Sequence, residues 1–424
     1  MPINKDKKIN NLQPTALTLF NSSFGKVIAA LAGFAVFSSA FHFWPFEKSR
    51  LFQRLCPSNS AVLIGCLLLT LYVLKNRNWR ELSTLLPNIS IFAYISISIL
   101  SAAFASDIVI SGSFTIKLAL MLIGGFILMS CAINSAGRLN SFYILTAVAA
   151  AITLVSCLID RAILKTGNFG FFNNPYKYGT YTGIMVALAS TYLLTERDFK
   201  KKSGGATILI LGLLCSASLG ATAAIITAIL TSAIIIPNRS VKVVISLSLI
   251  GSIGLLLLLS SSTFLKPLTD DIKPAEKNSN NLRQRYIEWQ AEINLLERRT
   301  ATGTATGCIN DYRSSFYYRL PKLNTLAPFD QNGWLQVAAE TGFLGLVCFC
   351  WIIIYYARLA YTSAVKSTKQ FSSITQRASA ANLAGISAAC VANLFSSVQY
   401  NGVLIAFAMV LVLTAKTNLL IAER

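Results

Sequence analysis

The stretch APFDQNGWLQVAAETGFLGLVCFCWIII (Ala327–Ile354) marks the point at which a long polar segment of the chain becomes hydrophobic. From Gly333 onward the run is long and apolar enough for a membrane helix, which needs about 20 such residues. Asp330, Gln331 and Asn332 stand directly before it, although an ordinary membrane span begins with little more than a Trp or Lys anchor. The stretch therefore predicts a membrane helix that opens on a polar functional group.

The composition of the whole chain indicates an all-α integral membrane protein. Of its 424 residues, 54% are hydrophobic and only 13% are charged, whereas about a quarter of the residues of a soluble protein are charged. The net charge of +20 would suggest a nucleic-acid partner in a soluble protein. Here we expect no nucleic acid, because lysines and arginines in short loops set the topology of a membrane protein.

The hydropathy pattern predicts about twelve transmembrane helices with one long periplasmic loop that contains short helices. The two spans at 204–218 and 221–236 are expected to form a tight helical hairpin. The expected spans are 24–45, 59–74, 88–105, 114–134, 141–159, 178–195, 204–218, 221–236, 243–260, 333–357, 379–396 and 402–420.

This pattern divides the chain into three parts. Residues 1–260 form an N-terminal membrane bundle of about nine helices, 261–332 the long loop, and 333–424 a C-terminal group of about three helices. Lysines and arginines are concentrated in the loops that this topology places inside, so both termini are expected in the cytoplasm and the long loop outside. Within the loop, 280–299 has a partly helical apolar pattern, and the glycines of 303–307 are expected to form a flexible hinge.

Two polar regions on the expected outer face could bind an anion. Arg283, Arg285 and Arg313 lie in the long loop, and the guanidinium group pairs with phosphate oxygens through two donors. The alternative is that such arginines anchor to lipid head groups or pair with glutamates at helical spacing. The second region is a helix start that follows Asn174, where Arg161 and Lys177 flank a free helix N-terminus; a capped loop with interfacial anchors is the alternative.

No metal or cofactor site is expected. His42 is the single histidine of the chain, and the cysteines form neither a CxxC pair nor a cluster with histidine. Zinc sites are built from such clusters.

The order of four short motifs along the chain resembles a known family. The resemblance rests on FFNNPYKYG, then RYIEW in the long loop, GTATG, and DQNGWLQVAAETGFLGL before two further spans.

The chain resembles, over residues 165–360, the O-antigen ligase and O-antigen polymerase family of bacterial polytopic membrane glycosyltransferases. In that family an arginine stands four residues before a tryptophan at the opening of the periplasmic loop, a short glycine motif follows, and the loop closes on histidine–asparagine before a helix with a glutamate and a GxxG. The residues similar to these are Arg285 and Trp289, Gly303 and Gly307, Asn332, Glu340, and Gly342 and Gly345.

Two positions depart from the family pattern. Gln331 stands where the family has histidine, and glutamine cannot take up a proton. Leu219 stands where the family often has an arginine at the turn between two middle spans. Both family residues are implicated in ligase chemistry, so their absence favours a polymerase over a ligase.

The resemblance implies transfer of a glycan from an undecaprenyl-diphosphate-linked donor to a sugar hydroxyl at the periplasmic face of the bacterial inner membrane. It implies a metal-independent enzyme without a cofactor, in which Arg285, with Arg283 and Arg313, stabilises the diphosphate leaving group. Asp330 or Glu340 would act as the general base, and Gln331 and Asn332 would position sugar hydroxyls.

Three functions remain open on this interpretation. The first is polymerisation of lipid-linked repeat units of a surface polysaccharide such as O-antigen. The second is ligation of the finished glycan to a lipid A-core acceptor, and the third is a flippase or transporter for a lipid-linked sugar. The expected partners are the lipid-linked oligosaccharide donor, a glycan or lipid A-core acceptor and membrane lipids, and a chain-length regulator is a further candidate.

Overall fold

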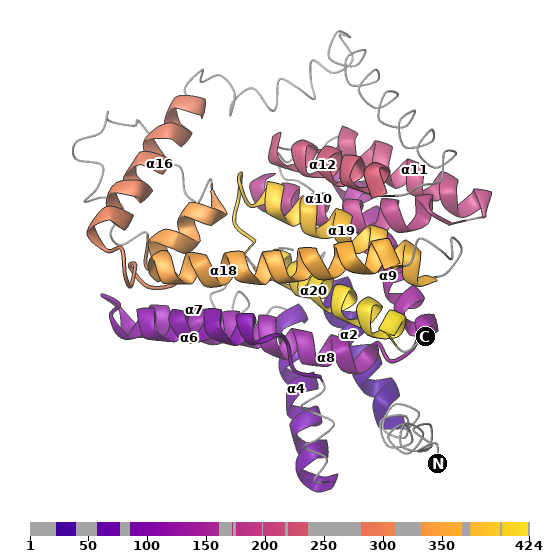
Figure 1. The fold of residues 1–424 in the computed structure, drawn as a ribbon, viewed down its shortest axis with the longest axis horizontal. Helices are drawn as coiled ribbons and strands as arrows, with labels where there is room; N and C mark the ends of the chain where they lie inside the picture. Colours follow the sequence, from indigo (N-terminus) through magenta and orange to yellow (C-terminus); the bar gives the residue numbers. More distant parts are fainter. Residues whose placement is uncertain are drawn as a thin grey trace, which may run out of the picture.

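The computed structural model describes residues 23–39, 57–76, 85–160, 172, 175–196, 198–216, 219–235, 281–309, 332–366, 374–398 and 401–422. The elements in these ranges are helices, most of them arranged side by side along one direction, with α16 set apart at one end (Figure 1). They are α2 (Ser23–Ser39), α4 (Pro57–Asn76), α6 (Ile89–Ala103), α7 (Ile108–Ala119), η3 (Leu120–Gly124), α8 (Gly125–Ala132), α9 (Ala136–Ile159), α10 (Pro175–Leu194), α11 (Phe199–Leu214), α12 (Leu219–Ile235), α16 (Asn281–Arg298), α18 (Gly333–Lys366), α19 (Ile374–Ala392) and α20 (Asn401–Ala422).

The expected spans coincide with these helices, apart from 243–260, which lies outside the described residues. The span expected at 114–134 is one continuous run made of α7, η3 and α8, with a single π-helical turn at its centre. Within the described ranges, five helices are long and apolar enough to cross a membrane, and three shorter apolar helices accompany them. The all-helical class is therefore confirmed, whereas the count of about twelve spans and the periplasmic loop stay predictions.

Side-chain caps fix where several of these helices begin. The Asn88 Oδ1 atom accepts from Ser90 N at 2.9 Å, and the Asp107 Oδ1 atom accepts from Ile110 N at 2.9 Å. The Ser135 and Asp198 side chains cap α9 and α11 in the same way. Such caps satisfy main-chain N–H groups that have no partner inside the helix, and they are the reason that these short polar residues interrupt the hydrophobic runs.

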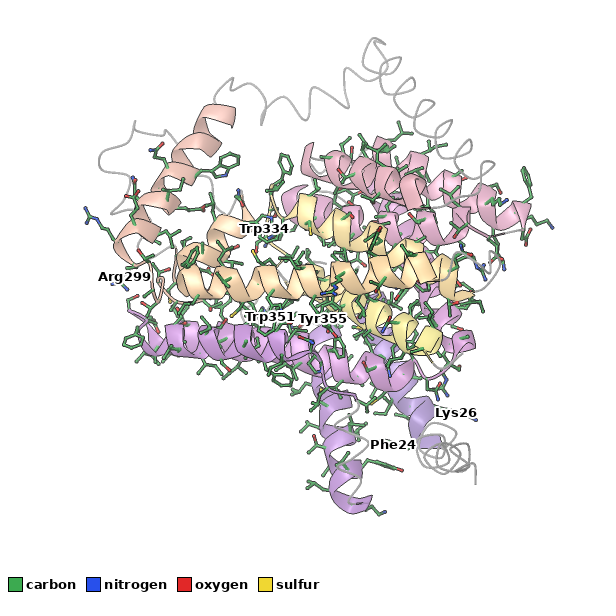
Figure 2. All side chains as sticks on the ribbon, in the orientation of Figure 1. Phe24, Lys26, Arg299, Trp334, Trp351 and Tyr355 are labelled. Atoms are coloured by element: carbon green, nitrogen blue, oxygen red, sulfur yellow. The ribbon has the colours of Figure 1, made fainter. Side chains whose placement is uncertain are left out.

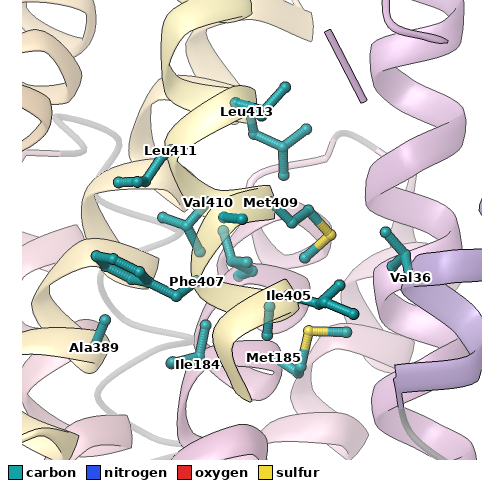
Figure 3. Packing of buried hydrophobic residues seen from close by; sticks show 14 of the residues in the cluster. Val36, Ile184, Met185, Ala389, Ile405, Phe407, Met409, Val410, Leu411 and Leu413 are labelled. Carbon is teal, nitrogen blue, oxygen red and sulfur yellow. The ribbon is translucent and has the colours of Figure 1, made fainter. Parts of the chain in front are cut away.

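The core is centred on α10 and α20, whose middle turns are buried on all sides. Figure 3 shows Ile184 and Met185 of α10 packed near Ile405, Phe407 and Met409 of α20. A second layer consists of small residues, which let helix axes approach closely where lipid supplies no hydrophobic driving force. Its members come from α10, α12 and α19, and they are Ala187, Ala224, Ala228, Ala384, Ala388 and Ala392.

The expected hairpin of 204–218 and 221–236 is only partly right. Helices α11 and α12 do follow each other closely in the chain. Each nevertheless packs more extensively on α10 than on the other, and α12 also lies along α19. Alanine and glycine explain this arrangement, because a Cβ added to Gly183 of α10 would already touch the Cβ of Ala224 in α12 at 3.2 Å.

Contacts between residues that are distant in the sequence show which helix ends lie together. At one end, the Cys308 Sγ atom lies 3.7 Å from the Asp107 main-chain oxygen, and Gly333 N donates to Asn393 O at 2.7 Å. At the other end, the Tyr192 hydroxyl donates to Asn140 Oδ1 at 2.6 Å and the Ser363 hydroxyl to Asn418 Oδ1 at 3.1 Å. These pairs identify helix ends that lie together, and the side of the membrane that each end faces stays a prediction.

Candidate functional site

Helix α18 is broken at Gly342. Its backbone there has φ 73° and ψ −178°, a region that essentially only glycine occupies because a Cβ atom would clash with the neighbouring main chain. The element therefore consists of a short segment, 333–341, and a long segment, 343–366, which meet at an angle near the end of the bundle (Figure 1). A break of this kind leaves carbonyl groups at the end of the first segment without helical partners.

The turn formed by residues 300–307 supplies those partners. Thr304 N donates to Ala339 O and Ala305 N donates to Glu340 O, both at 2.8 Å. In return, Phe343 N donates to Thr300 O at 2.8 Å. Main-chain groups of the turn and of the helix break thus satisfy each other, and the turn that ends α16 is fixed to the point where α18 changes direction.

Two glycines make this close approach possible. Gly303 also has a positive φ, of 65°, and a Cβ atom added to it would run into the main chain of Glu340. A Cβ atom added to Gly342 would run into the main chain of Ala301. The expectation of a flexible hinge at 303–307 was therefore wrong, because residues 303–306 are buried and the main chain of 303–305 is hydrogen-bonded into the fold.

A third element, α6, joins this contact through Ser101. The Ser101 hydroxyl lies 2.8 Å from the main-chain oxygen of Glu340 and also contacts the main-chain oxygen of Thr302. Ser101 is itself 2% exposed. One side chain of α6 therefore touches both the turn and the helix break, and we call the arrangement of Ser101, residues 300–307 and the break at Gly342 the interlock.

Glu340 is the acid of this region. Its side chain is 1% exposed, and its Oε1 atom accepts a hydrogen bond from the Gln336 Nε2 atom at 3.1 Å. Burying a carboxylate is unfavourable unless neighbouring groups compensate for the lost water. A buried acid at the end of a helical segment can accept a proton from a bound hydroxyl, which is the chemistry that a general base needs.

Asn332 caps the start of α18. Its Oδ1 atom accepts from Trp334 N at 3.0 Å and from Leu335 N at 3.2 Å. Trp334, at the start of α18 (Figure 2), donates from its Nε1 atom to Cys390 O at 3.2 Å, which ties this start to α19. The oxygen of the Asn332 amide is thus used for capping, and its NH₂ group remains as a donor.

Helix α16 carries the arginines expected to bind a diphosphate. Position 285 lies two helical turns before Glu292 and on the same helix face, whereas position 283 lies about 160° around the axis from position 285. Glu292 is 4% exposed, and Leu295, one turn later, packs with Ala339 of α18 and with Ile309. The helix therefore places position 285, and not position 283, on the face that continues into the contact with α18.

Glu292 is buried, and the alternative that the arginines of α16 pair with glutamates at helical spacing stays a prediction. Of the other expected residues, Lys177 is half-buried in the first turns of α10. Asp330, Gln331, Arg313, Arg161 and Asn174 lie outside the described residues.

Sequence reasoning missed two residues of this region, Ser101 and Gln336, and it also missed the burial of Glu292. Ser101 is one of several serines in an apolar span, and no local pattern distinguishes it from Ser98, which bonds within its own helix. Gln336 stands four positions before Glu340, a spacing that brings two side chains together on a helix. This four-residue spacing was the sequence signal that could have identified Gln336 as a partner of Glu340.

The helices and the buried polar site together define a membrane-type helical protein with an acid-bearing site at one end of its bundle. A protein-family model described as O-antigen ligase matches residues 204–350, a range that contains α16, the interlock and Glu340. This match supports assignment to the O-antigen ligase/polymerase family, with a glycosyltransferase-type activity in a bacterial membrane. A search among curated proteins found no match.

Proposed function

We propose that the protein is a membrane glycosyltransferase that polymerises surface-polysaccharide repeat units carried on undecaprenyl diphosphate. One observation supports the proposal: within the family-matched range, the turn at 300–307 and the helix break at Gly342 meet at the buried Glu340, and α16 packs through Leu295 on the adjacent Ala339. This grouping favours treating the matched residues as one site.

The reaction follows from the groups that this site contains. The oxygen of an acceptor sugar hydroxyl attacks the anomeric carbon of the donor glycan, and its proton passes to the Glu340 carboxylate. The bond between that carbon and the diphosphate oxygen breaks, and the electron pair leaves with undecaprenyl diphosphate. Arg285, on the face of α16 that leads toward α18, stabilises the negative charge of the leaving group, as preorganised cations do.

The reaction needs no metal if the arginines provide this charge stabilisation. Arg313 lies outside the described residues and remains a second candidate for that role. Arg283 lies on the opposite face of α16 from position 285, so a single diphosphate would be reached from α16 by Arg285 first. The enzyme is proposed to act at the periplasmic face of the inner membrane, with both termini in the cytoplasm and the site at the outer end of the bundle.

A ligase that transfers the finished glycan to a lipid A-core acceptor is the second candidate, because the family model that matches is described as O-antigen ligase. Gln331 in place of the family histidine favours the polymerase. The two functions differ in the glycolipid that builds up when the protein is absent, and that difference can be read on a gel.

The test is a deletion strain complemented with the wild-type chain or with Arg285→Ala. Loss of a polymerase leaves lipopolysaccharide with a single repeat unit, whereas loss of a ligase leaves none and lipid-linked polymer accumulates. Loss of a flippase leaves the precursor on the inner side of the membrane. Arg298→Ala, on the same helix but exposed, is the matched control and should complement fully. If Arg285→Ala also complements fully while present at normal levels, the proposed site is wrong.

The role of the polar residues before α18 needs its own pair of variants. Asp330→Asn removes the acid that stands next to Gln331, and Gln331→His restores the family residue. Full activity of Asp330→Asn would leave Glu340 as the acid of the reaction, with Asp330 only a helix-start residue. Loss of activity that Gln331→His restores would instead assign proton uptake to the residues before Asn332.

A further inference from the structure

The turn that follows α19 contains buried polar groups that the proposed reaction does not use. Asn393 is 2% exposed and Ser396 is 1% exposed. Within the described part of the chain, neither the Asn393 Nδ2 atom nor the Ser396 Oγ atom has a hydrogen-bond partner. Buried polar groups are nearly always paired, so unused groups of this kind indicate an absent partner.

Asn393, from this turn, lies against the start of α18. Gly333 N donates to Asn393 O at 2.7 Å, and a Cβ atom added to Gly333 would collide with the Asn393 side chain. The Asn393 Oδ1 atom accepts from Val398 N at 3.0 Å, which fixes the amide and leaves its NH₂ group as the unused end. Asn393 is therefore held next to the residue that follows Asn332.

The same face of α18 carries a third unused group and the acid. Positions 333, 336 and 340 recur at helical spacing, so Gly333, Gln336 and Glu340 share one face of the short segment. The Gln336 Nε2 atom donates to Glu340, and its Oε1 atom has no partner among the residues described. One face of the short segment of α18 therefore contacts Asn393 at Gly333, in the first turn of the segment, and carries Glu340 two turns later.

The chemistry of the three groups selects a ligand. Together they offer an amide donor, an amide acceptor and a hydroxyl that does both, and residues 389–398 contain no charged side chain. A diphosphate would find no cation there. Hydroxyl groups of a sugar ring, each of them a donor and an acceptor, match the set.

We propose that Asn393, Ser396 and Gln336 form a neutral sugar subsite that binds glycan hydroxyls beside Glu340. This inference rests on the proposed function, and it adds the place where the sugar, as distinct from the diphosphate, is held. Because the three atoms are closed off from solvent, a sugar reaches them when the turn after α19 separates from Gly333. Ligands can stabilise such minor open states of a protein.

The variants that test the subsite are Ser396→Ala and Asn393→Asp. Ser396→Ala removes only a hydroxyl that has no described partner, and Asn393→Asp keeps the oxygen that accepts from Val398 N while it removes the donor. The matched control is Ser379→Ala, at the opposite end of α19, where the hydroxyl bonds to Thr375 O at 2.8 Å within the helix. Each protein is purified in lipid nanodiscs as the full chain.

The assay follows glycan transfer from lipid-linked glycan extracted from the deletion strain. Oligosaccharide released by mild acid from the bacterium's own surface polysaccharide serves as a competing soluble ligand. We expect the KM or the inhibition constant to rise about three- to tenfold in both variants, as loss of one hydrogen bond implies, with kcat little changed. A rise confined to the oligosaccharide inhibition constant assigns the subsite to the acceptor, and a rise confined to the KM of the lipid-linked glycan assigns it to the donor.

A second measurement does not depend on activity. The oligosaccharide should raise the Tm of the wild-type protein and of Ser379→Ala, and raise it less for Ser396→Ala. If the wild type shows this shift but no transfer, the subsite stands and the proposed function fails. If Ser396→Ala and Asn393→Asp match the control in both measurements, or if the oligosaccharide leaves the wild-type Tm unchanged, the subsite is wrong.

Discussion

The Ser101 hydroxyl of α6 lies 2.8 Å from the main-chain oxygen of Glu340 in α18, across 239 positions of the sequence. The same oxygen accepts from Ala305 N in the turn at 300–307. The carbonyl of the buried acid is therefore held from two sides by elements that are distant in the chain. Any change that loosens either contact should affect the position of the Glu340 side chain, because that side chain begins at the same residue.

We expect Ser101→Ala to lower both stability and transfer activity. The hydroxyl contacts two carbonyl oxygens in a buried position, so its removal should cost about 1–3 kcal/mol in the free energy of unfolding. Thermal unfolding of the purified protein measures the first effect, and glycan assembly in the complemented deletion strain measures the second.

Ser98→Ala is the control for this prediction. Ser98 is buried on the same helix, one turn earlier, and its hydroxyl bonds to Tyr94 O within α6 at 3.0 Å. It should behave nearly like the wild type. Equal effects of the two substitutions would mean that Ser101 contributes only as a buried serine of α6 and not through the interlock.

The second prediction concerns the paired glycines of the interlock. Gly303→Ala and Gly342→Ala should each abolish glycan assembly, because each adds a Cβ atom that meets main chain at a positive φ, where strain alone costs about 1–3 kcal/mol. Both substitutions break the same contact, so the double variant should unfold at nearly the temperature of the worse single variant.

Gly112→Ala provides the matched control for the glycines. Gly112 lies in α7, and a Cβ atom added there meets nothing within 4 Å. The substitution should leave activity intact and raise stability slightly, since alanine is favoured over glycine inside a helix. Additive losses in the double variant of Gly303 and Gly342 would show that the two glycines act on separate contacts.

Glu340→Gln tests the buried acid directly. The substitution keeps the size and the planar shape of the side chain but removes its ability to accept a proton, so transfer should fall by at least about a hundredfold while the protein still folds. Transfer measured in nanodiscs, with Tm as the folding check, gives the answer. Glu297→Gln, at an exposed position of α16, should remain active; full activity of Glu340→Gln would restrict Glu340 to a structural role.

The opposite end of the bundle allows a prediction about stability alone. The Glu196 carboxylate pairs with Arg377, which is 9% exposed and lies 5.1 Å from the centre of the Tyr192 ring. Lys201 approaches the same carboxylate at 3.6 Å, but its side chain is 48% exposed. Arg377→Leu should therefore cost about 1–3 kcal/mol, because it leaves a largely buried carboxylate without its nearest cation.

Lys201→Ala should change the free energy of unfolding by less than about 0.5 kcal/mol, since exposed ion pairs contribute little. Thermal unfolding at low and high salt compares the two variants. Both should retain transfer activity, because this pair lies at the end of the bundle away from Glu340. A loss of activity without a loss of stability in Arg377→Leu would contradict the separation of the two ends.

Much of the helical architecture could be predicted from the sequence. Each hydrophobic run within the described residues became a helix, and short polar residues such as Asn88 and Asp107 cap helix starts. The positions of Glu340 and of the glycines at 303, 307, 342 and 345 were also selected by resemblance. These features are local, since hydropathy, capping and glycine conformation act over a few residues of chain.

The function of those glycines could not be predicted in the same way. A glycine pair separated by a few residues is compatible with a hinge, and the local sequence does not show whether another segment fills the space that a missing side chain leaves. In the structure, main-chain atoms of Glu340 occupy the space beside Gly303, and main-chain atoms of Ala301 occupy the space beside Gly342. The hinge interpretation failed because it considered conformational freedom and not packing.

The sequence by itself therefore determined that this chain is helical and membrane-type, and where its helices and its acid lie along the chain. Only the tertiary structure decided that Ser101, residues 300–307 and Gly342 meet at one carbonyl, and that Asn393 meets Gly333. The physical reason is the range of the interactions. Burial of an apolar run depends on its own composition, whereas the pairing of a buried hydroxyl or carbonyl depends on which distant groups the packed helices bring within hydrogen-bond distance.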